Sequence, residues 1–149
     1  MAVTSHTYTK FAATLGAKGA NLTSDTLKVM LLSAYTVGTT QDTAQYVADV
    51  KAVATETTGT GYSAGGATLT SVTYTESGHV YTLTCANPSW SATGGSLAAA
   101  YALFYDSTPG TDATNPVLCY WDLGGTQTAT NAAFTLMINA SGLLIVTGS

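Results

Sequence analysis

Short runs of alternating apolar and polar residues make up most of the chain after residue 25. In residues 26–32, Leu27, Val29 and Leu31 occupy alternate positions, which is the pattern of a half-buried strand. In residues 96–106 both alternating faces are apolar, which predicts a central strand that is covered on its two sides. The same criteria predict further strands at residues 51–56, 68–75, 79–85, 117–123, 134–139 and 143–147.

The first 22 residues have a helical rather than an alternating pattern. Within residues 5–17 the spacing of the apolar side chains predicts a short helix that ends at a glycine; these side chains are Tyr8, Phe11, Ala12 and Leu15. Two interpretations of residues 1–22 stay open: a helix packed on its own sandwich, or an arm that reaches a neighbouring subunit, for example by strand addition. A second short helix or turn is expected in residues 41–50.

Eight or nine short strands separated by turn residues, with one N-terminal helix, predict an all-β fold. We expect an antiparallel β-sandwich or jelly roll, because the alternation of helices and strands typical of doubly wound folds is absent. A chain of 149 residues fits one domain with a sizeable core. Residues 23–149 are therefore expected to form a single β-sandwich domain that follows the N-terminal segment.

The charge composition excludes several classes of function. Only twelve residues are charged, namely four Lys, six Asp and two Glu, with no Arg, whereas Thr alone contributes 29 residues. Nucleic-acid binding requires rows of cationic side chains, and catalysis usually requires clusters of titratable groups. We therefore expect no nucleic-acid partner and no enzymatic activity. A surface rich in Thr, Ser, Gly and Tyr is better suited to packing against other protein.

The sequence predicts neither an export signal nor a membrane span. The first 22 residues lack both a basic region and a continuous apolar region of the kind found in secretory peptides. The longest apolar stretch, residues 97–105, is far shorter than the roughly 20 residues that cross a bilayer. We expect a soluble protein that is made in a cytosol and has no membrane partner.

Two features that resemble catalytic or ligand-binding motifs have simpler explanations. The glycine-rich segment Gly59–Gly66 lacks the Gly-Lys-Ser/Thr ending of a phosphate-binding loop and is better explained as a connection between strands. The two histidines, His6 and His79, accompany no Gly-x-Ser-x-Gly motif, so neither is expected to serve a catalytic triad.

Cysteine and aspartate residues also give no clear metal site. Cys85 and Cys119 lie in separate strand-like runs and are expected to be buried thiols, with a disulfide possible if their strands are neighbours. Asp106 and Asp112 could offer oxygens to Ca²⁺, but their spacing does not match a calcium-binding loop and turn chemistry explains them equally well. We expect no cofactor and no structural metal.

Aromatic residues concentrate in the C-terminal half, where core packing is expected to account for most of them. A subset at the surface would bind sugar rings or anchor a protein interface, where Tyr and Trp are over-represented. Together with two residues of the N-terminal segment, the interface candidates are Tyr8, Phe11, Trp90, Tyr101, Tyr105 and Trp121.

Several segments, taken in order over residues 21–145, resemble a group of small structural proteins of tailed bacteriophages. The segments are Asn21-Leu-Thr-Ser-Asp-Thr-Leu-Lys-Val-Met-Leu-Leu32, Tyr46-Val-Ala-Asp-Val50, Glu56 with Gly59-Thr-Gly-Tyr-Ser-Ala-Gly-Gly66, Trp90-Ser-Ala92, Ala102-Leu-Phe-Tyr-Asp106 and Cys119-Tyr-Trp-Asp-Leu-Gly124. The resemblance implies a component of the virion and suggests a capsid decoration, or cement, protein. It implies no catalytic residues.

A cement role predicts specific partners. Such a protein binds between major capsid subunits and acts as a homo-oligomer, a dimer or trimer, through many modest contacts repeated over a symmetric lattice. We therefore expect it on the capsid surface of the virion, after synthesis in the host cytoplasm. Two alternatives stay open: a tail or fibre component of the virion, and a carbohydrate-binding β-sandwich module that uses Trp90, Tyr101 or Trp121.

Overall fold

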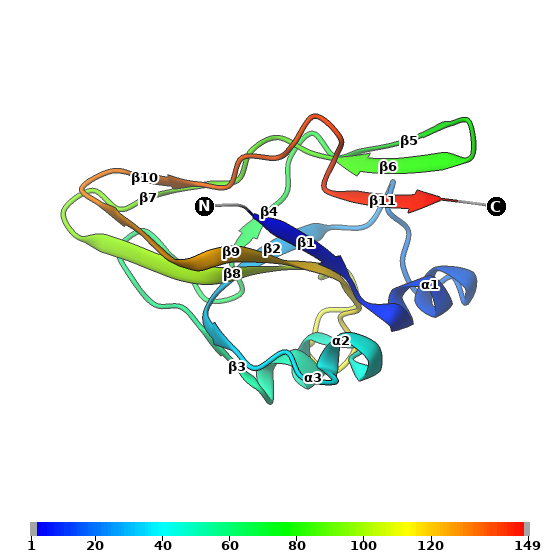
Figure 1. Cartoon of the computed structure of the whole chain (residues 1–149), viewed down its shortest axis with the longest axis horizontal. Helices are drawn as coiled ribbons and strands as arrows, with labels where there is room; N and C mark the ends of the chain where they lie inside the picture. Colours follow the sequence, from blue (N-terminus) through cyan, green and yellow to red (C-terminus); the bar gives the residue numbers. More distant parts are fainter. Residues whose placement is uncertain (1–2, 148–149) are drawn as a thin grey trace.

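The computed structural model describes residues 3–147, so residues 1–2 of the predicted N-terminal segment and residues 148–149 of the predicted sandwich lie outside it. Antiparallel strands make up most of this part of the chain and are accompanied by three short helices (Figure 1). The predicted all-β, sandwich-like fold with a short N-terminal helix is confirmed.

The largest sheet has six strands and forms the middle layer of the molecule (Figure 1). Its order is β1–β9–β8–β2–β3, and β4 pairs with the first residues of β2 on the edge where β3 pairs with the last ones. β8 is therefore central, as its two apolar faces predicted. The bounds are β1 (Thr4–Thr7), β2 (Leu27–Tyr35), β3 (Ala54–Glu56), β4 (Ala67–Thr68), β8 (Ser96–Asp106) and β9 (Val117–Thr130).

Cross-strand pairing assigns side chains to the two faces of this sheet. Met30, Leu103 and Tyr120 are successive partners across β2, β8 and β9, so they share one face. Ala102 and Trp121 form the neighbouring pair, each one residue along its strand from that first row, and they share the opposite face. All five residues are buried, because both faces of the sheet are covered.

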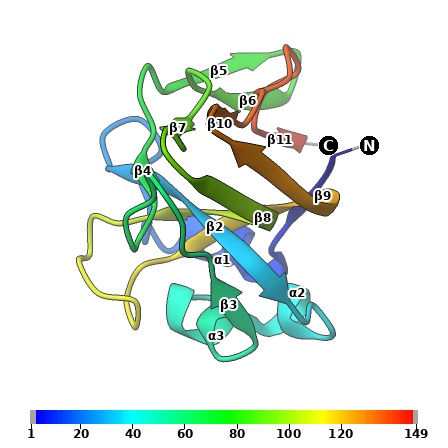
Figure 2. The same ribbon diagram turned by 90° about the vertical axis from the view of Figure 1, so that its left-hand side faces the viewer.

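Two helices cover the Tyr120 face, and two small sheets cover the Trp121 face (Figures 1 and 2). The hydroxyl of Tyr120 donates a hydrogen bond to Oε1 of Gln41 in the first of these helices, at 3.2 Å. Leucines and aromatic rings of the small sheets join the core of the main sheet. The bounds are α2 (Thr40–Thr43), α3 (Val47–Lys51), β5 (Thr73–Ser77), β6 (Val80–Thr84), β7 (Ser89–Ser91), β10 (Ala133–Thr135) and β11 (Leu144–Thr147).

The N-terminal segment packs on its own sheet. The predicted helix is shorter than expected: α1 spans Thr9–Gly16, and the residues before it form strand β1 instead. The cause is tertiary, because β9 offers an edge to which β1 binds, and the amide of Tyr8 then donates to the carbonyl of Leu118 at 3.2 Å. Tyr8, which precedes the helix, and Phe11 are buried, whereas Ala12, which has the same predicted helical spacing, is exposed.

Long-range pairing also divides the helix or turn expected in residues 41–50. Between α2 and α3, the carbonyl of Gln45 accepts a hydrogen bond from the amide of Val117 at 3.0 Å, and the backbone becomes extended at Tyr46. Because α3 continues to Lys51, the strand expected from residue 51 begins only at Ala54.

The strand expected at residues 68–75 is interrupted. Its first residues belong to β4 in the main sheet and its last ones to β5 in a small sheet, with Ser71 at a φ of 52° between them. β5 and β6 form a hairpin whose two turn residues with positive φ are Gly78 and His79, so the strand expected from residue 79 begins at Val80.

Candidate functional site

Most of the aromatic candidates lie in the core of the single chain. Five are buried and Tyr101 is half-buried; the five are Tyr8, Phe11, Trp90, Tyr105 and Trp121. Their role at an interface stays a prediction. A carbohydrate-binding module stacks sugar rings on exposed aromatic faces, so the burial of both tryptophans gives that alternative no support.

Tyrosines form the packing contact between the N-terminal segment and the main sheet. The hydroxyls of Tyr8 and Tyr35 are 2.9 Å apart and hydrogen-bonded, and the ring of Tyr120 packs edge-on against Tyr35 with centroids 5.2 Å apart. Burial raises the pKa of Tyr8 and Tyr35 and raises that of Tyr120 to about 12. Sequence analysis did not single out Tyr35, whose neighbours become apparent only in the fold.

Three titratable groups converge beside the glycine-rich connection. Nζ of Lys51 lies 2.9 Å from Oδ2 of Asp112 and 3.4 Å from Oε2 of Glu56. The hydrogen bond with Asp112 is the largest cause of the raised pKa of Lys51. Oε1 of Glu56 accepts hydrogen bonds from the hydroxyl of Tyr62 and the amide of Gly65. These contacts close the connection, which supports the structural explanation of Gly59–Gly66.

The histidines and cysteines do not form a catalytic arrangement in the described part of the chain. The ring of His6 stacks on Tyr120 with centroids 4.9 Å apart, and His79 lies in the β5–β6 turn. Both thiols are free: Cys119 is buried in β9, and Cys85 is half-buried after β6, in a different layer. Burial raises the pKa of Cys85 to about 11 and that of Cys119 further.

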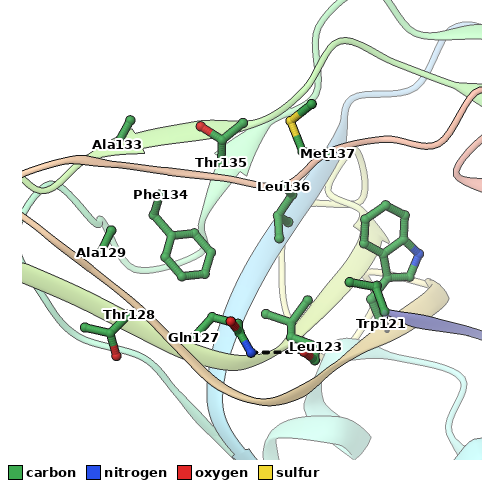
Figure 3. Close-up of a pocket in the computed structure, with 11 residues that line it drawn as sticks. Trp121, Leu123, Gln127, Thr128, Ala129, Ala133, Phe134, Thr135, Leu136 and Met137 are labelled. Atoms are coloured by element: carbon green, nitrogen blue, oxygen red, sulfur yellow. Dashed lines mark hydrogen bonds between the residues drawn. The ribbon is translucent and has the colours of Figure 1, made fainter. Parts of the chain in front are cut away.

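A groove lined by apolar and uncharged polar side chains lies between β9 and the segment that contains β10 (Figure 3). We call it the β9–β10 groove; its volume is about 310 Å³. The close-up shows side chains from both segments pointing into the space between them. The residues that define the groove are Trp121, Leu123, Gln127, Phe134, Leu136 and Met137.

A wide bulge in β9 shapes the groove. Asp122 of β9 pairs with Tyr101 of β8. The next residue of β9 to pair with β8 is Gln127, so β9 advances by five residues over a stretch in which β8 advances by only two. Gly124 and Gly125 take up this excess with φ values of 73° and 110°. Nε2 of Gln127 donates to the carbonyl of Leu123 at 3.2 Å and to that of Gly125 at 3.3 Å, which fixes the bulge.

Strand edges border the groove. β1 pairs with β9 only as far as Asp122, and in residues 3–147 no strand pairs with residues 123–130 on that side. β10 pairs with β7 on one side only, and it occupies three residues instead of the expected strand at residues 134–139. Unpaired edges offer backbone donors and acceptors to an additional extended chain.

Exposed apolar side chains and one unsatisfied donor complete the site. Met137 is 71% exposed and Val3 is 53% exposed, and both line the groove. The side chain of Trp121 is buried at 5% exposure, and its Nε1 has no hydrogen-bond acceptor. An indole N–H can only donate, so the group is suited to a carbonyl oxygen.

The β9–β10 groove suits a polypeptide better than a charged substrate. None of its lining side chains is charged, so its threonine hydroxyls have no acidic or basic side chain in the lining to activate them. It combines apolar and uncharged polar side chains with open backbone edges. These are the properties of a surface that binds an extended segment of protein. Of its residues, sequence analysis singled out only Trp121.

Comparisons with models of protein families, with curated proteins and with solved structures found no match. Within residues 3–147, no helix is both long enough and apolar enough to cross a membrane.

Proposed function

We propose that this chain is a structural protein of the virion of a tailed bacteriophage, and that it acts as a capsid decoration (cement) protein. In this role it binds between major capsid subunits on the head surface and associates with itself as a dimer or trimer. The order of sequence segments that resemble small phage structural proteins supports the class. The β9–β10 groove is the observation that carries the binding role.

The uncharged lining and the open strand edge of the groove support the proposal that it binds a protein partner. Uncharged walls favour apolar contact, and the open edge of residues 123–130 can add a strand. Each such contact is modest, but repetition over a symmetric shell multiplies its effect. The low charge of the chain, with four Lys, no Arg and eight acidic residues, is consistent with a partner surface of protein rather than nucleic acid.

The location of the protein on particles tests this proposal. We would purify the phage particles that carry the chain and determine their structure by cryo-electron microscopy. Symmetric density for the chain on the outer head surface, in contact with two or more capsid subunits, is the expected result. Density on the tail or a fibre would instead establish the alternative virion role, and absence of the chain from particles would contradict both.

A matched pair of variants tests the groove itself. Met137→Glu places a charge on its exposed rim and is expected to reduce binding to heads that lack the protein by at least about tenfold, because the charge must be desolvated. Ile145→Glu is the control, because Ile145 is also exposed, at 48%, but lies on β11 outside the groove. Co-sedimentation with heads measures both. Equal binding by the two variants would exclude the groove as the contact.

A further inference from the structure

The last five residues of β9, residues 126–130, form a free strand edge. They lie next to β8 on one side, whereas on the other side β1 pairs with β9 only as far as Asp122 (Figure 2). The wide bulge of β9 precedes this stretch, and Asn131, at a φ of 51°, turns the chain after it. The free edge is therefore a stretch of five residues with defined ends, and Thr128 lies at its centre.

Backbone groups of this stretch face the free edge at alternate residues. In β8, the carbonyls of Ser96 and Ala98 accept hydrogen bonds from residues 57–60, so both carbonyls point away from β9. In an antiparallel ladder, residues of this kind belong to pairs that exchange no hydrogen bond, and both members of such a pair direct their N–H and C=O groups outward. Their partners in β9 are Thr130 and Thr128. The amides and carbonyls of these two threonines therefore face the free edge, where no strand in residues 3–147 pairs with them.

The composition of residues 126–130 does not protect this edge from another strand. Soluble proteins usually protect an edge with charged side chains or proline, or by keeping the edge strand very short. On the opposite edge of the main sheet, β3 and β4 have only three and two residues. Residues 126–130 read Thr-Gln-Thr-Ala-Thr, without charge or proline, and their three threonines are exposed. Such an edge is suited to pairing with an additional strand.

Two copies of this edge are complementary to each other. The threonines are placed symmetrically about Thr128, so full antiparallel overlap of two copies sets Thr128 opposite Thr128 and Thr126 opposite Thr130. Threonine pairs across antiparallel strands are favourable. Antiparallel pairing of identical strands is also the arrangement that a two-fold axis generates. Because the stretch carries no charge, no like charges meet at that axis.

We propose that the chain forms a two-fold symmetric dimer in which residues 126–130 of two copies pair antiparallel about Thr128. The main sheets of the two copies then form one continuous sheet. This inference rests on the self-association contained in the proposed function, and it gives that self-association a surface and a register. It assigns the edge of residues 126–130 to the second copy and leaves the rim of the β9–β10 groove at Met137 to the capsid subunit.

Sedimentation equilibrium of the isolated chain tests the dimer and its register. The wild-type chain is expected to have the mass of two chains. Thr128→Lys and Thr128→Glu each place two like charges opposite each other at the axis, so each variant alone is expected to dimerise at least about tenfold more weakly. An equimolar mixture of the two variants is expected to restore the dimer, because opposite charges then face each other. Thr75→Lys and Thr75→Glu are the controls: Thr75 is also an exposed threonine, but it lies on β5, and both changes are expected to leave the dimer intact.

Circular dichroism establishes that the variants are folded. A wild-type chain that stays monomeric up to about 0.1 mM would overturn the proposal, whether or not any variant folds. A dimer that the changes at Thr128 do not weaken, or that the mixture of variants does not restore, would overturn it as well, because the contact would then lie elsewhere. Equal weakening by the changes at Thr75 would have the same consequence.

The assay uses the chain alone, so its failure is distinguishable from failure of the proposed function. A dimer with the expected register, formed by a chain that is absent from phage particles, would contradict the virion role and leave this inference standing. A monomer in solution that occupies the head surface would contradict this inference and leave the virion role standing.

Discussion

At the scale of single residues, one hydroxyl group completes the main sheet where its edge is interrupted. β2 pairs with β4 as far as Val29 and with β3 from Leu32 onward, which leaves Leu31 between the two short strands. The amide of Leu31 donates to the hydroxyl of Tyr62 at 3.1 Å, and that hydroxyl donates to Oε1 of Glu56 at 2.8 Å. The side chain of Tyr62 thus accepts the hydrogen bond that a neighbouring strand would otherwise accept from Leu31.

Tyr62→Phe should therefore destabilise the fold although it removes a single atom. The buried amide of Leu31 loses its acceptor, and we expect the free energy of unfolding to fall by about 1–3 kcal/mol. Urea denaturation measures the change. Tyr81→Phe is the control, because the ring of Tyr81 is 38% exposed, and its stability should stay within about 0.5 kcal/mol of the wild type. Equal stability of the two variants would contradict the role of Tyr62.

Residue roles at the candidate site were only partly predictable. The sequence identified Trp121 as an aromatic candidate, but alternation cannot say whether a ring in a doubly apolar strand points to solvent or into the core. The groove depends on the bulge at Gly124 and Gly125 and on the position of Gln127, and these arise from pairing with a strand about 25 residues earlier. A glycine pair inside a strand was the signal that could have indicated the bulge.

At the scale of elements, local patterns predicted which segments are strands, and long-range pairing decided where each strand ends. β8 was predicted with its full length because both of its faces are buried. β1 was missed because its four polar or half-polar residues form a strand only where β9 offers an edge. The expected strand at residues 68–75 was divided because its halves belong to different sheets.

Gly66 has no side chain, which allows the backbone before β4 to lie close to β2, and this predicts the effect of Gly66→Ala. Its φ is 72°, and an added Cβ would overlap the carbonyl oxygen of Val29. Gly110→Ala is the matched control: its φ is 96° but the space around it is open, so only backbone strain of about 1–2 kcal/mol applies. We expect Gly66→Ala to lose clearly more unfolding free energy than Gly110→Ala in thermal or urea denaturation. Equal losses would show that strain alone matters.

At the scale of the whole molecule, the described residues contain few ion pairs but several buried or partly buried tyrosines. Two ion pairs, both with Lys51, are present in the described residues, whereas several phenol groups lie wholly or partly inside. Burial is the first cause of the raised pKa of Tyr105 and of Tyr120, each to about 12, and it also raises the pKa of Tyr8 and Tyr62. The protonation of tyrosine is therefore coupled to folding.

This coupling predicts a steep loss of stability in alkali. The unfolded chain releases its tyrosine protons near pH 10, whereas the folded chain keeps those of Tyr105 and Tyr120 until about pH 12. Between these values the unfolded state binds fewer protons, so the free energy of unfolding must fall as pH rises. Urea denaturation at successive pH values, with tyrosinate absorbance recorded in parallel, measures the slope.

The slope should begin between about pH 8 and 9, where the unfolded chain releases the thiol protons of Cys85 and Cys119 that the folded chain keeps, and should steepen above about pH 10, where the tyrosines follow. Tyr105→Phe removes one of the coupled groups, so its stability curve should fall less steeply over that interval even though the variant starts lower through loss of the hydrogen bond to the carbonyl of Gly65. A wild-type curve that stays flat to pH 11, with full tyrosinate absorbance already present in the folded chain, would mean that these phenols ionise without unfolding and that their burial does not hold their protons.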